Sequence, residues 1–213
     1  SILYVSVNEV GFFAYDITNP SSPQQLYHTD FGLNLSNVGL GTFTVGKNFA
    51  YVFTPNLPVL SIISIADPAN IFRISTHSPP LSSSSSGDLV HLGGDTVLLT
   101  SAGYIMQLID YSNPFSPAIV DWVEVSPNRS YGQLVECEGF VYACGQTLSI
   151  FDVRNRSQIR LIANRNMPYG NRASVSISGH RLFCVELSEK LQIYSVGTQL
   201  ANPQIAGQFG VSN

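Results

Sequence analysis

Four histidines are the side chains in this sequence best suited to bind a metal or to transfer a proton near neutral pH. His28, His77, His91 and His180 lie far apart, and none belongs to an H-E-x-x-H or paired Cys/His motif. The chain also lacks a G-x-S-x-G motif and a glycine-rich phosphate loop. We therefore expect no enzymatic activity, no cofactor and no metal site, although a Ser/His/Asp arrangement built from distant loops stays open.

Three N-x-S sequons carry a different chemistry, the attachment of a glycan to asparagine. They begin at Asn34, Asn128 and Asn155. A run of serines at 82–86 predicts a flexible polar loop, with O-glycosylation as an alternative. Either modification depends on a compartment that holds the glycosylation machinery.

The low charge of the chain narrows the classes of partner. Charged residues make up 11% of the sequence, against about 25% in an ordinary soluble domain. Ten basic and fourteen acidic residues without a Lys/Arg cluster argue against a nucleic-acid or anionic membrane partner, and no apolar run is long enough to insert into a bilayer. A weakly charged surface favours glycans, an extracellular or cell-surface location, or burial in an assembly.

The elements that position these residues belong to an internal repeat. Five copies share an apolar run that ends in Asp or Ser, followed by a turn and a further apolar run. The residues that end this run are separated by 48, 46, 42 and 43 positions, and they are Asp16, Ser64, Asp110, Asp152 and Ser195. Copies two to five are preceded by a further short apolar segment, at 41–46, 88–93, 132–139 and 173–179.

A period near 45 with four short strands per copy is typical of the blades of a β-propeller. No apolar stripe of helical period is present, and Val, Ile, Tyr, Phe and Thr alternate with turn residues. The sequence therefore predicts an all-β fold, a single five-bladed propeller over 1–213. The expected blades cover approximately 1–36, 37–80, 81–127, 128–170 and 171–213.

Asp16, Asp110 and Asp152 precede the turn between the third and fourth strands of their copies. Proline in the Asn-Pro steps ends a strand because it fixes φ and cannot donate to the sheet. An Asp side chain before such a turn can accept hydrogen bonds from the turn amides. We expect all three carboxylates to be structural turn caps.

The segments VGFFAYDITNPSSP at 10–23 and YIMQLIDYSNPFSP at 104–117 resemble the repeat unit of the LVIVD family of β-propellers. Copy four departs from this pattern with Asn155 and Arg156 in place of Asn-Pro, and copies two and five have Ser64 and Ser195 in place of Asp. The resemblance implies the propeller architecture and an extracellular setting. It implies little about activity, because the motif is structural.

The three cysteines, Cys137, Cys144 and Cys184, form no C-x-x-C pair, and their odd number excludes complete intramolecular pairing. Cys144 and Cys184 are expected in equivalent strands of successive blades, about 10 Å apart, which is too far for most such pairs to form a bridge. Buried thiols are the expectation, with one disulfide as the alternative.

Copy one begins directly at its second strand, so five blades contain nineteen expected strands and the first blade lacks its innermost strand. An exposed strand edge attracts another chain. We therefore predict a structural, self-assembling scaffold that binds copies of itself or another surface protein through this edge, where head-to-tail strand donation would form a filament. The alternatives are a three-stranded blade without such a role, and a propeller that binds a glycan or peptide through aromatic loops containing Phe31, Tyr131 and Tyr169. A hydrolase or lyase is the third hypothesis.

Overall fold

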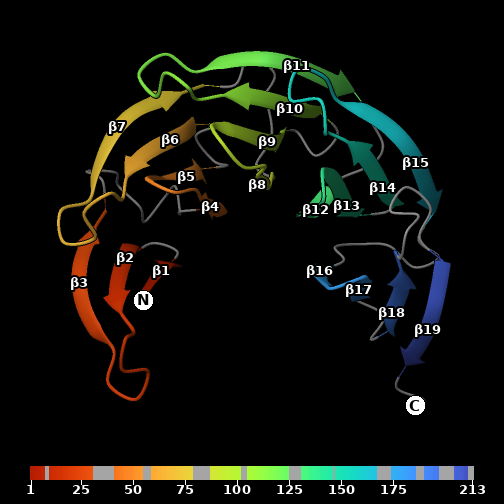
Figure 1. Cartoon of the computed structure of the whole chain (residues 1–213), viewed down its shortest axis with the longest axis horizontal. Coiled ribbons are helices and arrows are strands. Elements are labelled where there is room, and N and C mark those ends of the chain that lie inside the picture. Colours follow the sequence, from red (N-terminus) through yellow and green to blue (C-terminus); the bar gives the residue numbers. More distant parts are fainter. Residues whose placement is uncertain are drawn as a thin grey trace.

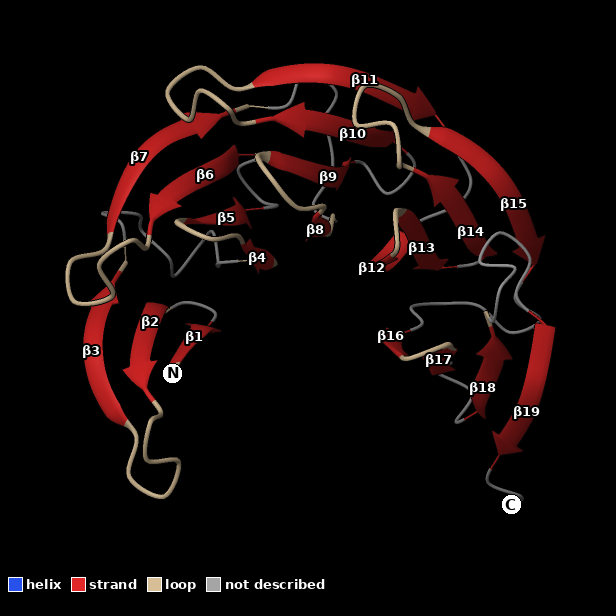
Figure 2. Cartoon of the chain, in the orientation of Figure 1, coloured by secondary structure: helices blue, strands red, loops and turns tan. Residues whose placement is uncertain are grey.

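The structure is a computed structural model of all 213 residues. It describes residues 1–7, 10–30, 41–54, 59–78, 87–101, 105–124, 131–145, 147–166, 174–185, 190–196 and 204–210. Within these ranges the chain is all-β and contains no helix, as the repeat predicts (Figure 2).

Nineteen strands form five antiparallel sheets, which are the blades of the predicted β-propeller. Blade one consists of β1 (Ile2–Val7), β2 (Gly11–Asp16) and β3 (Gln24–Thr29). Blade two consists of β4 (Phe43–Val45), β5 (Phe49–Thr54), β6 (Val59–Ser64) and β7 (Phe72–His77), and blade three of β8 (Leu89–His91), β9 (Thr96–Ser101), β10 (Ile105–Asp110) and β11 (Ala118–Glu124). Blade four consists of β12 (Tyr131–Cys137), β13 (Phe140–Gly145), β14 (Thr147–Asp152) and β15 (Arg160–Asn166), and blade five of β16 (Ser174–Ser178), β17 (Arg181–Val185), β18 (Lys190–Ser195) and β19 (Gln204–Gly210).

The strands of each blade follow one another in sequence order, from the inner to the outer side of the molecule (Figure 1). The segments expected to be innermost strands form β4, β8, β12 and β16. Blade one has three strands, so the prediction that it lacks the innermost strand is confirmed. In every blade the pairing of the last two strands contains a bulge, which bends the outer strand over the sheet.

Hydrophobic clusters fill the spaces between consecutive blades, because side chains alternate between the two faces of each strand. Four clusters join blades one to two, two to three, three to four and four to five. Among the described residues no cluster joins blade five to blade one. Figure 1 shows the same arrangement, an open arc with β1–β3 at one end and β16–β19 at the other.

The turns between the last two strands use side-chain oxygens as caps. The backbone amides of Thr18, Ser112 and Arg154 donate to the carboxylates two residues before them, at 2.8, 2.8 and 3.1 Å. These acceptors are the residues expected to cap the turns, Asp16, Asp110 and Asp152.

A second side-chain cap recurs three residues further on. Asn19, Asp67, Asn113 and Asn155 each accept a hydrogen bond from the amide two positions later, at 3.0 to 3.2 Å. This second cap explains how copy two turns without the first Asp and how copy four turns without proline.

Candidate functional site: the uncovered faces of the terminal blades

Blade one has one face that no other blade covers within the described part of the chain. Phe12 and Ala14 of β2 are buried against blade two, so the intervening residues Phe13 and Tyr15 lie on the opposite face. Leu3 is paired in register with Tyr15, and it is 45% exposed. We call this surface the blade-one face, and it consists of Leu3, Val5, Val7, Phe13, Tyr15 and His28.

Aromatic contacts order the middle of the blade-one face. The Phe13 ring stacks on His28 with 4.3 Å between ring centroids and on Tyr15 with 6.1 Å. Nε2 of His28 lies 3.2 Å from the carbonyl oxygen of Val10. The face is therefore apolar and ordered, yet it is open to solvent.

Blade five also has an apolar face that no other described blade covers, on the side that points away from blade four. Leu182 and Cys184 of β17 are buried against blade four, so Phe183 and Val185 point away from that blade. Val185 is 47% exposed. The blade-five face consists of Phe183, Val185, Leu191 and Ile193, which are paired in register as Phe183 with Ile193 and Val185 with Leu191.

The equivalent positions in the central blades are buried. Register places Val185 opposite Leu191 in the way that it places Phe53 opposite Leu60 in blade two. Phe53 is fully buried because blade three covers it. The exposure of Val185 therefore follows from the lack of a neighbouring blade among the described residues and not from its place in the repeat.

The inner edge of blade one is also open. Among the described strands, β1 pairs with β2 alone, whereas β5, β9, β13 and β17 each have a strand on both sides. An unpaired edge exposes backbone donors and acceptors that can pair with another strand. The blade-one face and this edge meet at β1.

A buried carboxylate joins three blades near the inner ends of the sheets. Asp88, 7% exposed, precedes β8, and its Oδ1 accepts a hydrogen bond of 2.5 Å from the Thr42 hydroxyl of blade two. Its Oδ2 accepts a hydrogen bond of 2.7 Å from the Leu134 amide of blade four. Burial raises the pKa of the Asp88 carboxyl, and the hydrogen bonds from Thr42, Leu134 and Leu89 act in the opposite direction.

Gln133 makes the corresponding link between blades four and five. Its Oε1 accepts hydrogen bonds from the Val175 amide at 2.9 Å and from the Ser174 hydroxyl at 2.8 Å. The sequence analysis did not identify Asp88 or Gln133 as functional residues. The available signal was a polar residue at the start of successive innermost strands, because Thr42, Asp88 and Gln133 recur with the period of the repeat.

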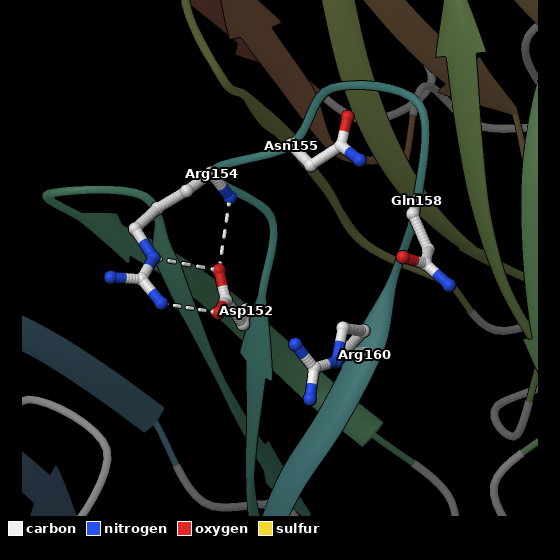
Figure 3. A pocket seen from close by; sticks show the side chains of 5 residues that line it. All are labelled: Asp152, Arg154, Asn155, Gln158 and Arg160. Atoms are coloured by element: carbon white, nitrogen blue, oxygen red, sulfur yellow. Dashed lines mark hydrogen bonds and ion pairs between the residues drawn. The ribbon is translucent and has the colours of Figure 1, made fainter.

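A cavity of about 480 Å³ lies at the turn between β14 and β15, lined by Asp152, Arg154, Asn155, Gln158 and Arg160 (Figure 3). Arg154 Nε and Nη2 donate to the two carboxylate oxygens of Asp152 at 2.9 and 2.6 Å. This contact lowers the pKa of Asp152 and neutralises both groups. Arg160 forms no ion pair within the described part of the chain, so the cavity carries one surplus positive charge.

The structure does not bring the four histidines together. His28 and His77 lie on the outer strands β3 and β7, and His180 lies in the turn before β17. His91 lies on the inner strand β8, and its ring stacks on Tyr51 at 6.0 Å between ring centroids. No group of three or more metal-ligating side chains occurs among the described residues.

The other predicted sites are only partly described. Asn155 is exposed in its turn, whereas Asn34, Asn128, the serine run at 82–86, Phe31 and Tyr169 lie outside the described residues. Tyr131 was expected in a loop, and this prediction is wrong because Tyr131 begins β12 and pairs with Gly145.

Comparison with known proteins gives the fold. No family model and no curated protein matches the sequence, so the resemblance to LVIVD propellers stays a prediction. A protein of unknown function from Desulfotomaculum acetoxidans is similar at a TM-score of 0.78 and 13% identity, over 99% of this chain and 67% of that chain. A periplasmic gluconolactonase from Pseudomonas aeruginosa is similar at 0.79 and 11%, over 99% and 67%.

BamB from Moraxella catarrhalis is similar at a TM-score of 0.64 and 11% identity, over 98% of this chain and 58% of that chain. The chain thus spans about two thirds or less of the length of these three structures. The described part of the chain contains no helix that could span a membrane. The site that the geometry singles out is the pair of uncovered faces at the two ends of the arc.

Proposed function

We propose that this protein is a self-assembling, non-enzymatic scaffold in which the blade-five face of one copy binds the blade-one face of the next. The observation that supports this proposal is the exposure of apolar side chains at positions that are buried between the central blades. Leu3 and Val185 represent the two faces. Covering them removes apolar surface from water, which stabilises the contact by about 25 cal/mol per Å² of apolar area buried.

Such a contact repeats a geometry that the chain already uses four times. We call the face of a blade that points toward the next blade in sequence its forward face, and the face that points toward the preceding blade its backward face. At every interface between blades, the forward face of one blade packs against the backward face of the next. A contact between blade five and blade one of different copies is therefore heterologous, and it propagates into a filament unless the rotation closes a ring. The open edge of β1 offers a second attachment by strand addition. We also propose an extracellular or cell-surface location, which the low charge and the exposed sequon at Asn155 support.

Charged substitutions on the two faces test this proposal. Sedimentation velocity over a range of concentrations should show assemblies of the wild-type chain. Leu3→Asp and Val185→Asp should each weaken association at least about 100-fold, because burying an unpaired carboxylate costs several kcal/mol. Phe115→Asp is the matched control, because Phe115 is 75% exposed in a turn of blade three and belongs to neither face.

A mixture of the two variants tests the head-to-tail geometry. Each variant keeps one intact face, so an equimolar mixture should form dimers and no larger species. A wild-type chain that stays monomeric at all concentrations contradicts self-assembly. In that case the opening is a place for further chain or for another protein.

The cavity at Arg160 supports a second candidate function, the binding of a small acidic ligand such as a sugar acid. Its lining offers guanidinium and amide donors, which suit carboxylates and hydroxyl groups. One of the similar structures, from Pseudomonas aeruginosa, is named as a periplasmic gluconolactonase. This likeness concerns the fold, because identity is 11%.

Calorimetric titration with gluconate tests this candidate. Arg160→Ala should weaken binding about tenfold, which corresponds to one hydrogen bond to a charged group. Arg73→Ala is the control, since Arg73 lies on the outer strand β7 away from the cavity lining. Release of acid from glucono-δ-lactone, measured in parallel, tests the enzymatic alternative. Absence of binding to the wild type at millimolar gluconate contradicts this candidate.

A further inference from the structure

Two cysteines meet inside the interface between blades four and five. Cys144 of β13 and Cys184 of β17 belong to the same hydrophobic cluster, and both are fully buried. The two sulfur atoms lie 3.4 Å apart. Cys137, the third cysteine, is half-buried in β12.

The short distance follows from the direction of the two side chains. The backbones of packed sheets lie about 10 Å apart, which made a bridge between these strands unexpected. Register explains the contact: Cys144 lies opposite Leu148 on the forward face of blade four, and Cys184 opposite Gln192 on the backward face of blade five. Both side chains therefore enter the same interface from opposite sides.

We propose that Cys144 and Cys184 form a disulfide bond that joins the last blade to blade four when the protein folds in an oxidising compartment. The sulfur atoms must approach by little more than 1 Å to reach the disulfide bond length of about 2.05 Å. The oxidant is a low-molecular-weight disulfide such as oxidised glutathione. This bond is independent of the assembly proposed above, although it secures the blade that carries the blade-five face.

The disulfide forms in two steps of thiol–disulfide exchange. The thiolate of one cysteine attacks the oxidant and forms a mixed disulfide, and one thiol of the oxidant leaves. The thiolate of the second cysteine then attacks the protein sulfur of that mixed disulfide, and the second thiol leaves. The two cysteines lose two electrons and two protons, and the two released thiols carry both protons.

Burial decides when the exchange takes place. Both thiols are inaccessible in the folded protein, so the reaction precedes the docking of blade five or uses its local opening. Blade five is a terminal blade with one uncovered face, and such elements open at lower free energy than the global fold. Once formed, the bond is shielded from reductants in the same way.

Mass spectrometry after oxidative refolding tests the proposal. The protein is refolded with oxidised glutathione, denatured and alkylated with iodoacetamide. One alkylated cysteine, Cys137, is expected, together with a linked peptide that contains Cys144 and Cys184. Cys144→Ser and Cys184→Ser should abolish the link, while the control Cys137→Ser should retain it.

Thermal unfolding gives a second measurement. The bond closes a loop of 40 residues, and loops of this size raise the midpoint of a domain like this one by about 10 °C relative to the reduced form. Three alkylated cysteines after oxidative refolding, or a link that involves Cys137, overturn the proposal. An oxidised form with the predicted link but an unchanged midpoint contradicts its role in securing blade five.

Discussion

Phe53→Ala is expected to lower the free energy of unfolding by about 4 kcal/mol, because it leaves a large cavity in a well-packed core. Phe53 is fully buried between blades two and three, where it packs in the cluster that contains Leu89 and Tyr111. Chemical denaturation followed by intrinsic fluorescence measures the effect, provided that the slope with denaturant is unchanged.

Two valines, one fully buried and one half-exposed, can be compared by the same measurement. Val141→Ala in blade four should cost about 2 to 3 kcal/mol, because Val141 is fully buried. Val185→Ala should cost less than about 1 kcal/mol at low protein concentration, since the side chain is half-exposed. Equal costs for the two valines at low concentration would mean that the blade-five face is already covered within one chain.

The fold could be predicted from the sequence because the patterns that determine it are local and recur in several copies. Strand alternation and the spacing near 45 recur along the chain, and an Asn-Pro or Asp-Pro step recurs in most copies, so a departure in one copy, such as Asn155-Arg156 in copy four, does not hide the repeat. The three-stranded first blade was found in the same way, by comparing copies. Asp16, Asp110 and Asp152 were placed before turns because each ends the apolar run of its copy just ahead of turn residues, a pattern that can be read within a single copy.

The exposure of the two faces, the burial of Asp88 and the contact between the cysteines could not be predicted in this way, because each depends on contacts between copies. Val185 has the same place in its copy as the buried Phe53, so nothing within the repeat distinguishes their exposure. The distance between Cys144 and Cys184 depends on which faces of two sheets meet. Asp88 resembles a loop residue in sequence, and its burial becomes evident only when Thr42 and Leu134 converge on it.

Asp88→Ala is expected to lower the free energy of unfolding by about 3 kcal/mol, because it leaves donors without their charged acceptor. The Leu134 amide and the Thr42 hydroxyl both lose their partner, and the amide is buried. Asp88→Asn is the control, since its amide oxygen can accept from Leu134 while its nitrogen donates to the Thr42 oxygen. The Asn variant should therefore stay within about 1 kcal/mol of the wild type at neutral pH.

The pH dependence of this difference reports the ionisation of Asp88. Burial raises the pKa of the folded carboxyl, so between the ordinary pKa of about 4 and the raised value the folded state binds more protons than the unfolded state. The wild-type free energy of unfolding, measured relative to Asp88→Asn, should therefore fall as pH rises through this range and then become constant. A relative stability that rises with pH would show that hydrogen bonds from Thr42 and Leu134 outweigh burial, and that the link between the three blades requires the ionised carboxylate.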